Sequence, residues 1–163
     1  MARAMQLDID IEDWPEGPWD TLAERAAEAA GAGEPLLANP RLIASVLFTS
    51  DAEVHTLNRE WRARDKPTNV LSFPMLEREE LGSLAADGPP EMLGDIALAY
   101  ETCAREAAEK GVTLEAHASH LIVHGLLHLV GHDHVESDEQ AEAMEALETR
   151  ILAKLGIADP YGD

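Results

Sequence analysis

The residues best suited to chemistry are histidines in the last third of the sequence. Five of the seven histidines fall between residues 120 and 134. His124 and His128 are four positions apart in an apolar segment, so a helix there would put both imidazoles on one face, with Cβ atoms roughly 6 Å apart. Gly131 lets the chain leave the helix, and His134 can then turn back towards the pair. Two or three imidazoles within reach of each other are typical ligands of a divalent metal ion.

A zinc site of this kind would be suited to catalysis. Three neutral imidazole ligands leave the ion dipositive and one coordination position open, and zinc lowers the pKa of a bound water towards about 7. Without a ligand, unmatched imidazoles inside an apolar helix would cost stability. We therefore predict one divalent metal ion per chain, held by His124, His128 and His134. His132 is an alternative to His134, and His120 is expected to support a ligand or to pack in the core.

The same spacing invites comparison with the zinc peptidase motif His-Glu-x-x-His-x-x-Gly-x-x-His. His124, His128, Gly131 and His134 coincide with the motif. Gly125, however, stands where the peptidases have the glutamate that acts as general base. A zinc peptidase-like hydrolase therefore stays an alternative that lacks its proton carrier.

A second group of candidate residues is basic. Four of the twelve basic residues fall between Arg59 and Lys66, in a chain whose net charge is −20. Arginine binds phosphate oxygens through a two-pronged guanidinium, whereas bases at a helix C-terminus are also explained by the helix dipole. Beside a metal site the phosphate interpretation is favoured, so this segment is the predicted phosphate-binding part of the molecule.

The helix that begins near Ser50 is expected to carry these bases. Val54, Leu57 and Trp61 follow the spacing of one buried stripe, and Arg62 lies at its edge. From there a long side chain can run along apolar surface with its charged end in a cleft. We therefore expect Arg62 to face the histidine-bearing helix across a groove.

Composition limits the possible classes of protein. The 163 residues are 45% hydrophobic and include 26 alanines but only three Trp, two Tyr and two Phe, which predicts an Ala-lined, helix-rich core. The net charge of −20 excludes a basic nucleic-acid coat and a polybasic membrane binder, although a local basic site is compatible with it. Cys103 stands alone, which excludes an intrachain disulfide and a cysteine zinc cage. With no apolar run near the ~20 residues of a membrane span and no secretory signal, a cytoplasmic protein is expected.

The pattern of apolar residues predicts an α+β fold. Alternating or short apolar runs predict strands at residues 5–11, 42–48, 69–73 and 93–99. Helices are predicted at residues 19–31, from residue 50 onwards, and at 100–110, 113–131 and 137–155. This order favours a single domain over residues 1–163, with a small mixed sheet covered by helices and the metal-bearing helix in the core. With the histidine cluster, the domain is predicted to be a metal-dependent hydrolase. Residues 75–92, rich in Gly, Pro and acids, are expected to form an exposed insert.

Together, these motifs resemble a known family, the bacterial YbeY family of rRNA-maturation endoribonucleases. The first similar block is Leu57-Asn58-x-x-Trp61-Arg62-x-x-Asp65-Lys66-Pro67-Thr68-Asn69-Val70-Leu71-Ser72-Phe73-Pro74. The next blocks are Leu93-Gly94-Asp95-Ile96, His124-Gly125-x-Leu127-His128-Leu129-x-Gly131-x-Asp133-His134 and Glu142-Ala143-Met144-Glu145. They follow the family's order over about residues 50–150, which makes the resemblance specific. His132, where the family often has Tyr, departs from the pattern.

The resemblance implies a function and a set of partners. It implies a zinc-dependent endonuclease that cleaves single-stranded RNA, matures the 3′ end of small-subunit rRNA and takes part in ribosome quality control. It assigns the zinc ligands to His124, His128 and His134, and the functionally important arginine to Arg62. The implied partners are rRNA and the small ribosomal subunit, and neither a membrane nor DNA is expected.

The general base stays open between two aspartates. Asp133 lies between ligand candidates and can orient an imidazole or take a proton, whereas Asp95 follows a glycine in a strand-like segment and is the weaker candidate. Arg62 and Asp133 are the predicted catalytic residues, with Arg62 stabilising charge on the phosphate oxygens. The rival to an enzyme is a non-catalytic, zinc-stabilised ribosome assembly factor. The net charge of −20 gives this rival some weight, because RNA would be repelled everywhere except at a local patch.

Overall fold

A four-stranded mixed sheet organises the chain. The computed structural model describes residues 5–62, 68–131, 138–158 and 160, with Arg62 described in its backbone alone. Within these residues the strand order is β1-β2-β4-β3, where β1 (Gln6–Ile11), β2 (Leu42–Thr49) and β4 (Glu91–Ala99) are parallel. β3 (Val70–Pro74) runs antiparallel to β4 and forms one edge of the sheet.

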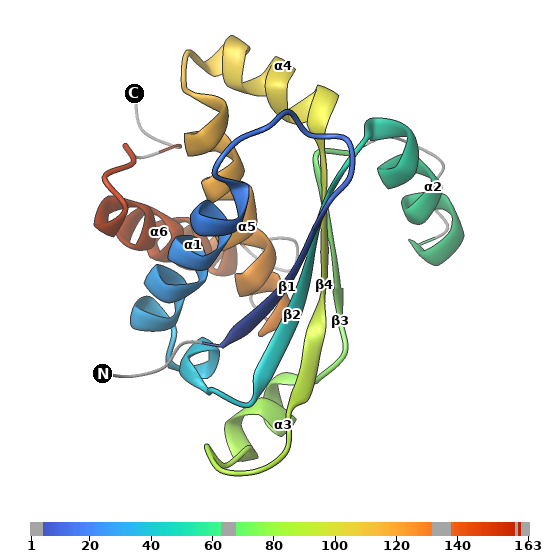
Figure 1. The fold of residues 1–163 in the computed structure, drawn as a ribbon. Coiled ribbons are helices and arrows are strands. Elements are labelled where there is room, and N and C mark those ends of the chain that lie inside the picture. The colour runs from blue at the N-terminus through green and yellow to red at the C-terminus, as the bar shows by residue number, and fades with distance from the viewer. Residues whose placement is uncertain (1–4, 63–67, 132–137, 159, 161–163) are drawn as a thin grey trace.

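Helices cover both faces of this sheet. Their bounds are α1 Trp19–Gly33, a 3-10 turn Pro35–Ala38, α2 Asp51–Arg62, α3 Arg78–Ser83, α4 Tyr100–Lys110, α5 Leu114–Leu129 and α6 Asp138–Lys154. Figure 1 shows α1, α5 and α6 on one face and α2 on the other. The predicted α+β class is thus confirmed, as one domain with a mixed sheet covered by helices and with the expected histidine-bearing helix at its centre.

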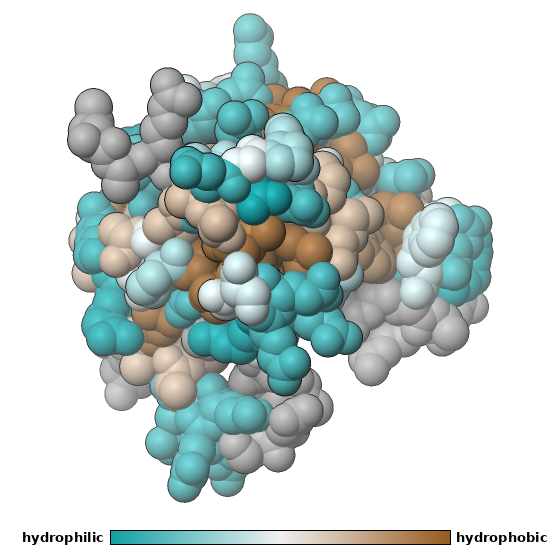
Figure 2. Space-filling view, turned by 90° about the horizontal axis from the view of Figure 1, so that it is seen from below, coloured by the Kyte–Doolittle hydropathy of each residue, from teal (hydrophilic) through white to brown (hydrophobic). Residues whose placement is uncertain are grey.

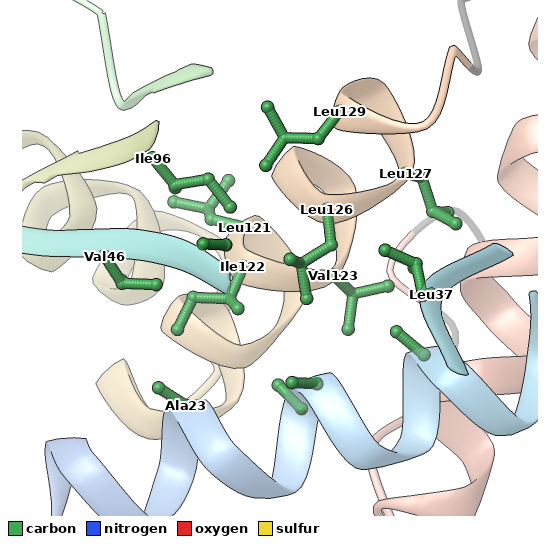
Figure 3. Close-up of a cluster of buried hydrophobic side chains, with 14 of the residues drawn as sticks. Ala23, Leu37, Val46, Ile96, Leu121, Ile122, Val123, Leu126, Leu127 and Leu129 are labelled. Carbon is green, nitrogen blue, oxygen red and sulfur yellow. The ribbon is translucent and has the colours of Figure 1, made fainter. Parts of the chain in front are cut away.

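The larger core lies between the sheet and α1, α5 and α6. Figure 3 shows side chains of α5 between Val46 and Ile96 of the sheet and Ala23 of α1 and Leu37. Apart from Trp19 at its first position, the buried residues of α1 are all alanines, fully or almost fully buried: Ala23, Ala26, Ala27 and Ala30. Small side chains let helices approach closely, so the alanine-rich composition corresponds to an Ala-lined core, as predicted.

α5 is the central helix of the molecule. Nearly all of its side chains from His117 to Leu129 are buried, because the sheet, α1, α4 and α6 surround it. The helix begins with an N-cap in which Thr113 Oγ1 accepts a hydrogen bond from the Ala116 amide across 3.0 Å. It ends before Gly131, whose φ of +93° lies in the region that favours glycine. These two signals explain why both ends of α5 could be predicted from the sequence.

The buried stripe of α2 is shorter than the sequence predicted. Val54 is fully buried and Leu57 is half-buried against the smaller core on this face, with Leu71 and Ala97. Trp61 was expected on the same stripe but is 72% exposed, so that prediction is wrong. The reason is that the last turn of α2 extends away from the sheet that covers its first turns (Figure 1). Helical periodicity gives the direction of a side chain but not the length of the surface that covers it.

The N-termini of α2 and α4 cap each other. Both carboxylate oxygens of Asp51 accept hydrogen bonds from Thr102, 2.9 Å from its amide and 2.7 Å from its hydroxyl. In return, Glu101 Oε1 accepts a hydrogen bond from the Asp51 amide across 2.9 Å. Ser50 Oγ adds a cap at 3.2 Å from the Glu53 amide. Acids at helix N-termini are favoured by the helix dipole, so each helix supplies the anion that the other needs.

Residues 75–92 contain ordered structure as well as exposed loops. α3 begins with a capping box between Glu77 and Glu80, and Leu81 is buried against the larger core. Arg41 donates hydrogen bonds to the carbonyl oxygens of Pro89 at 2.9 Å and Ala85 at 3.1 Å, which ties the loop before β4 to the sheet. The last two residues of the segment, 91 and 92, belong to β4.

The surface agrees with the high charge of the chain. Figure 2 shows, on the face seen from below, hydrophilic side chains around a central apolar area. Among the described residues, none of the helices combines the length and apolar character that crossing a lipid bilayer requires.

Candidate metal centre and catalytic residues

α5 brings two imidazoles to the surface near its C-terminal end. His124 Nε2 and His128 Nε2 lie 3.1 Å apart, as expected for side chains one helical turn apart on the same face. Both rings are partly exposed, with 21% of the His124 side chain accessible to solvent. The pair is therefore built on a buried helix yet open to a ligand from outside.

A buried carboxylate lies behind this pair. Glu148, on α6, is fully buried, and its Oε1 lies 2.5 Å from His124 Nδ1 while its Oε2 lies 3.3 Å from His120 Nε2. The sequence analysis missed this residue. A signal was present, because Glu148 shares a helical stripe with apolar residues that are themselves buried: Met144, Leu147, Ile151 and Leu152.

The geometry of the two histidines fits a divalent metal. A carboxylate is a hydrogen-bond acceptor, so the contact with Glu148 places the His124 proton on Nδ1 and leaves a lone pair on Nε2. Two nitrogen ligands at 2.0–2.1 Å from one tetrahedral zinc ion lie about 3.3 Å from each other. The observed 3.1 Å between the two Nε2 atoms is close to that separation. The lone pair on His124 Nε2 and the spacing of the two rings therefore suit a divalent metal ion.

The third predicted ligand cannot be placed beside this pair. His134, its alternative His132 and the candidate base Asp133 lie outside the described residues. Among the residues that are described, no group of three His, Cys, Asp or Glu side chains forms a metal-ligand set. His120 is buried, and its Nε2 contacts Glu148. Its ring centre lies 6.3 Å from that of His124. In this structure, His120 is therefore a partner of Glu148 and not a third member of the His124–His128 pair.

The arginine and the alternative base lie elsewhere than expected. Arg62 is the last residue of α2, and its side chain lies outside the described part of the chain. We expected α2 to face α5 across a groove, but the sheet lies between them (Figure 1). On β4, Asp95 lies between Gly94 and Ile96, which both face α5, and it pairs with Phe73 of β3. Because successive side chains of a strand point to opposite faces, Asp95 lies on the α2 face. Asp95 is thus on the opposite side of the sheet from the histidine pair.

Position 125 argues against peptidase chemistry. A Cβ atom on Gly125 would lie 3.1 Å from Cδ1 of Ile96 and 3.3 Å from its Cγ1. Because α5 packs this closely on β4, a glutamate at 125 would point into the sheet and not towards a cleft. The proton carrier of zinc peptidases has no room at its usual place in this molecule.

A second histidine–carboxylate pair joins α5 to α4. His117 Nε2 lies 2.9 Å from Glu106 Oε1, which also accepts a hydrogen bond from Asn69 Nδ2 at 2.9 Å. Burial lowers the pKa of His117 below its usual value, and the hydrogen bond to Glu106 opposes that shift without overcoming it. Burial acts to raise the pKa of Glu106, but the hydrogen bonds from His117 and Asn69 outweigh it and hold this pKa below its usual value. His117 is therefore a neutral structural residue at pH 7.

The one cysteine of the sequence is also buried in this region. Burial raises the pKa of the Cys103 thiol, and the nearby carboxylates of Glu106 and Asp51 add to the effect. The thiol is therefore neither a nucleophile nor a metal ligand at neutral pH.

Comparison with known proteins identifies the family. The protein-family model described as Endoribonuclease YbeY matches residues 8–156. The chain is 72% identical to the Endoribonuclease YbeY of Erythrobacter litoralis (strain HTCC2594) over 159 residues, which cover 98% of this chain and 99% of that protein. It is 57% identical to the Endoribonuclease YbeY of Novosphingobium aromaticivorans over 161 residues, covering 98% and 96%.

A solved structure shares the fold. The solution structure of TM1509 from Thermotoga maritima matches with a TM-score of 0.57 at 22% sequence identity, covering 97% of this chain and all of that one. The sequence matches define the class, which is that of endoribonucleases, hydrolases that cleave RNA. The chain belongs to the YbeY family of that class. The resemblance drawn from the motifs is thereby confirmed.

Proposed function

We propose that the chain is a zinc-dependent endoribonuclease specific for single-stranded RNA. It acts in the cytoplasm, in the maturation of the 3′ end of small-subunit rRNA and in ribosome quality control, with the small ribosomal subunit as its partner. The observation that carries the zinc part of this proposal is the separation of 3.1 Å between His124 Nε2 and His128 Nε2. Membership of an endoribonuclease family supports RNA as the substrate.

The proposed site assigns a role to each of its residues. His124, His128 and His134 hold one Zn2+, which when bound supplies a Lewis acid for a phosphodiester oxygen and a water of lowered pKa. Arg62 binds the non-bridging phosphate oxygens, where charge increases as the phosphodiester is cleaved. Asp133 takes or orients a proton. Since the sheet lies between α2 and α5, this role requires the Arg62 side chain to reach around the β3 edge to the phosphate at the metal.

The described surface of α2 supports a local site for RNA on an acidic protein. Arg59 and Trp61 are both exposed near the end of α2. Aromatic side chains beside bases are typical of single-stranded nucleic-acid sites, since a base stacks on the ring while the cation attracts the backbone. This combination favours a single strand over a duplex, in which the bases are already stacked.

Direct cleavage tests separate this proposal from its rivals. The zinc-loaded protein is incubated with a single-stranded RNA, the same sequence as a duplex, a single-stranded DNA and an unstructured protein. We expect cleavage of the single-stranded RNA alone, and His128→Ala should abolish it. Cleavage of the protein would favour a peptidase-like hydrolase. A His128→Ala variant that still restores ribosome assembly in cells would favour the non-catalytic assembly factor.

A further inference from the structure

Glu148 is a carboxylate in an unusual place. It is fully buried, on a stripe of α6 whose other members are apolar. Burying a carboxylate costs several kcal/mol unless partners compensate it, so an ordinary helix contact would use an apolar residue here. Glu148 instead has an imidazole at each oxygen, His124 at 2.5 Å and His120 at 3.3 Å.

The shorter of these two contacts determines which nitrogen of His124 can bind a ligand. Oε1 of Glu148 accepts a hydrogen bond from Nδ1, so the proton of the neutral ring stays on Nδ1. The lone pair is then on Nε2, which points at His128 Nε2, 3.1 Å away. If Nδ1 lost this partner, the proton could move to Nε2 and block the ligand position.

We propose that Glu148 is the positioning residue of the metal site. Its carboxylate fixes both the orientation and the tautomer of the His124 ring and makes Nε2 a stronger electron donor, as carboxylates behind metal-bound histidines do. The inference rests on the zinc site of the proposed function. Nothing in the sequence motifs assigns this role, because Glu148 lies outside each of the blocks that identify the family.

The rival explanation is purely structural. Glu148 could serve only to hold α6 on α5, with the histidines as convenient donors. Both explanations predict that removal of the carboxylate lowers stability. Both also predict a His124 ring protonated on Nδ1, because the histidine is the donor in either case. Only the positioning role predicts a loss of metal affinity in a variant that stays folded.

The test compares two neutral substitutions on the same helix. Glu148→Gln keeps the size of the side chain and an acceptor oxygen but removes the charge. Glu142→Gln makes the same change at an exposed position of α6 and is the control. Zinc affinity is measured on the full chain by competition with a chromophoric chelator. We expect about 10–100-fold weaker zinc binding for Glu148→Gln and less than about twofold change for Glu142→Gln.

A second measurement does not depend on any variant folding. Imidazole nitrogen chemical shifts of the metal-free wild type should show His124 protonated on Nδ1.

His120→Gln removes the longer contact of Glu148 and leaves the contact with His124, so it should lower the melting temperature while zinc affinity stays within about threefold of wild type.

Each outcome points to one conclusion. Equal zinc affinity of Glu148→Gln and wild type, or a His124 ring protonated on Nε2, would overturn the role of Glu148 and leave the proposed function intact. A wild type that binds zinc with the expected variant pattern but does not cleave RNA would overturn the proposed function and not this inference. A wild type that binds no zinc would overturn both.

Discussion

Arg78 Nη1 donates a hydrogen bond to the carbonyl oxygen of Val130 across 2.7 Å. The same guanidinium lies 3.8 Å from Glu34 Oε1, and its aliphatic part would be 3.2 Å from a Cβ at Gly131. Arg78 belongs to α3. Through Arg78, the segment 75–92 therefore contacts Val130 and Gly131, where the chain leaves α5 towards His134. A cation at this place also interacts favourably with the C-terminal end of the helix dipole.

Arg78→Ala should therefore affect both stability and metal binding. Half of the Arg78 side chain is exposed, so we expect a loss of about 1 kcal/mol in the free energy of unfolding, measured with urea. Zinc binding should weaken because the turn towards His134 loses its support. Arg105→Ala is the control, since the Arg105–Glu109 pair at 3.9 Å is exposed on both sides and should contribute less than about 0.5 kcal/mol. Equal effects of the two substitutions would contradict the role of Arg78.

Removal of one histidine of the pair should empty the site. His128→Ala is expected to lose zinc in elemental analysis, because a single imidazole on α5 is left to bind the ion. Added zinc should raise the melting temperature of the wild type and leave that of His128→Ala unchanged. His55→Ala, on α2, should behave like the wild type in both measurements. Full metal retention in His128→Ala would show that the ligands lie elsewhere.

Arg62→Ala should separate chemistry from folding. We expect the variant to keep its zinc and its melting temperature and to cleave at least about 10²-fold more slowly, since a contact that tightens in the transition state is lost. Arg59→Ala, three positions earlier and exposed, should weaken RNA binding mildly and lower the salt slope by about 0.7. Zinc content, melting temperature and single-turnover cleavage are measured on the same samples. Unchanged cleavage by Arg62→Ala would exclude a catalytic role.

Trp61 should contribute to RNA binding and not to stability. Because the side chain is 72% exposed, Trp61→Ala should change the free energy of unfolding by less than about 0.5 kcal/mol. Loss of one stacked base should weaken single-stranded RNA binding by about 5–100-fold, and Trp61→Phe should recover most of it. Trp14 and Trp19 are buried, so quenching of tryptophan fluorescence by RNA reports on Trp61. Equal affinity of the Ala variant and the wild type would contradict this role.

The pair His117–Glu106 should make the metal-free protein less stable in acid. The pKa of folded His117 lies below its usual 6.5, so its contribution to stability is complete above pH 6.5 and is lost as the pH falls through the folded pKa. The pKa of folded Glu106 lies below 4.5, so its contribution is lost at still lower pH. The free energy of unfolding should fall as the pH decreases from 7 towards 4. His117→Gln should flatten the upper part of this profile, and an unchanged slope would contradict the assignment.

The sequence predicted the strands and the longer helices because each of them carries a strong local signal. β2 is a short continuous apolar run, and α5 has an N-cap at Thr113 and a stop at Gly131. α3 was missed because its N-cap is Glu77, a residue type that seldom marks a helix start, within a segment rich in Gly and Pro.

The candidate site was less predictable because its parts meet only through packing. The spacing of His124 and His128 is local, so their contact could be predicted. Glu148 reaches His124 only because α6 packs on α5, and a glutamate in an acidic helix is no signal on its own. Trp61 was misplaced for the complementary reason, since the sequence does not show where the surface under α2 ends.

The mutual caps of Asp51 and Glu101 fix the N-terminal end of α2, so the position of its other end depends on the angle at which they hold the helix. α2 has 12 residues and is therefore about 18 Å long, and the caps hold its first turn while its last residue is Arg62. A tilt of about 5° at Asp51 would move the far end by about 1.6 Å, and a misplacement of about 1 Å can slow a reaction about 10²-fold. Substitutions at this corner of the molecule could therefore change the rate of RNA cleavage while zinc affinity and the residues that meet the RNA stay the same.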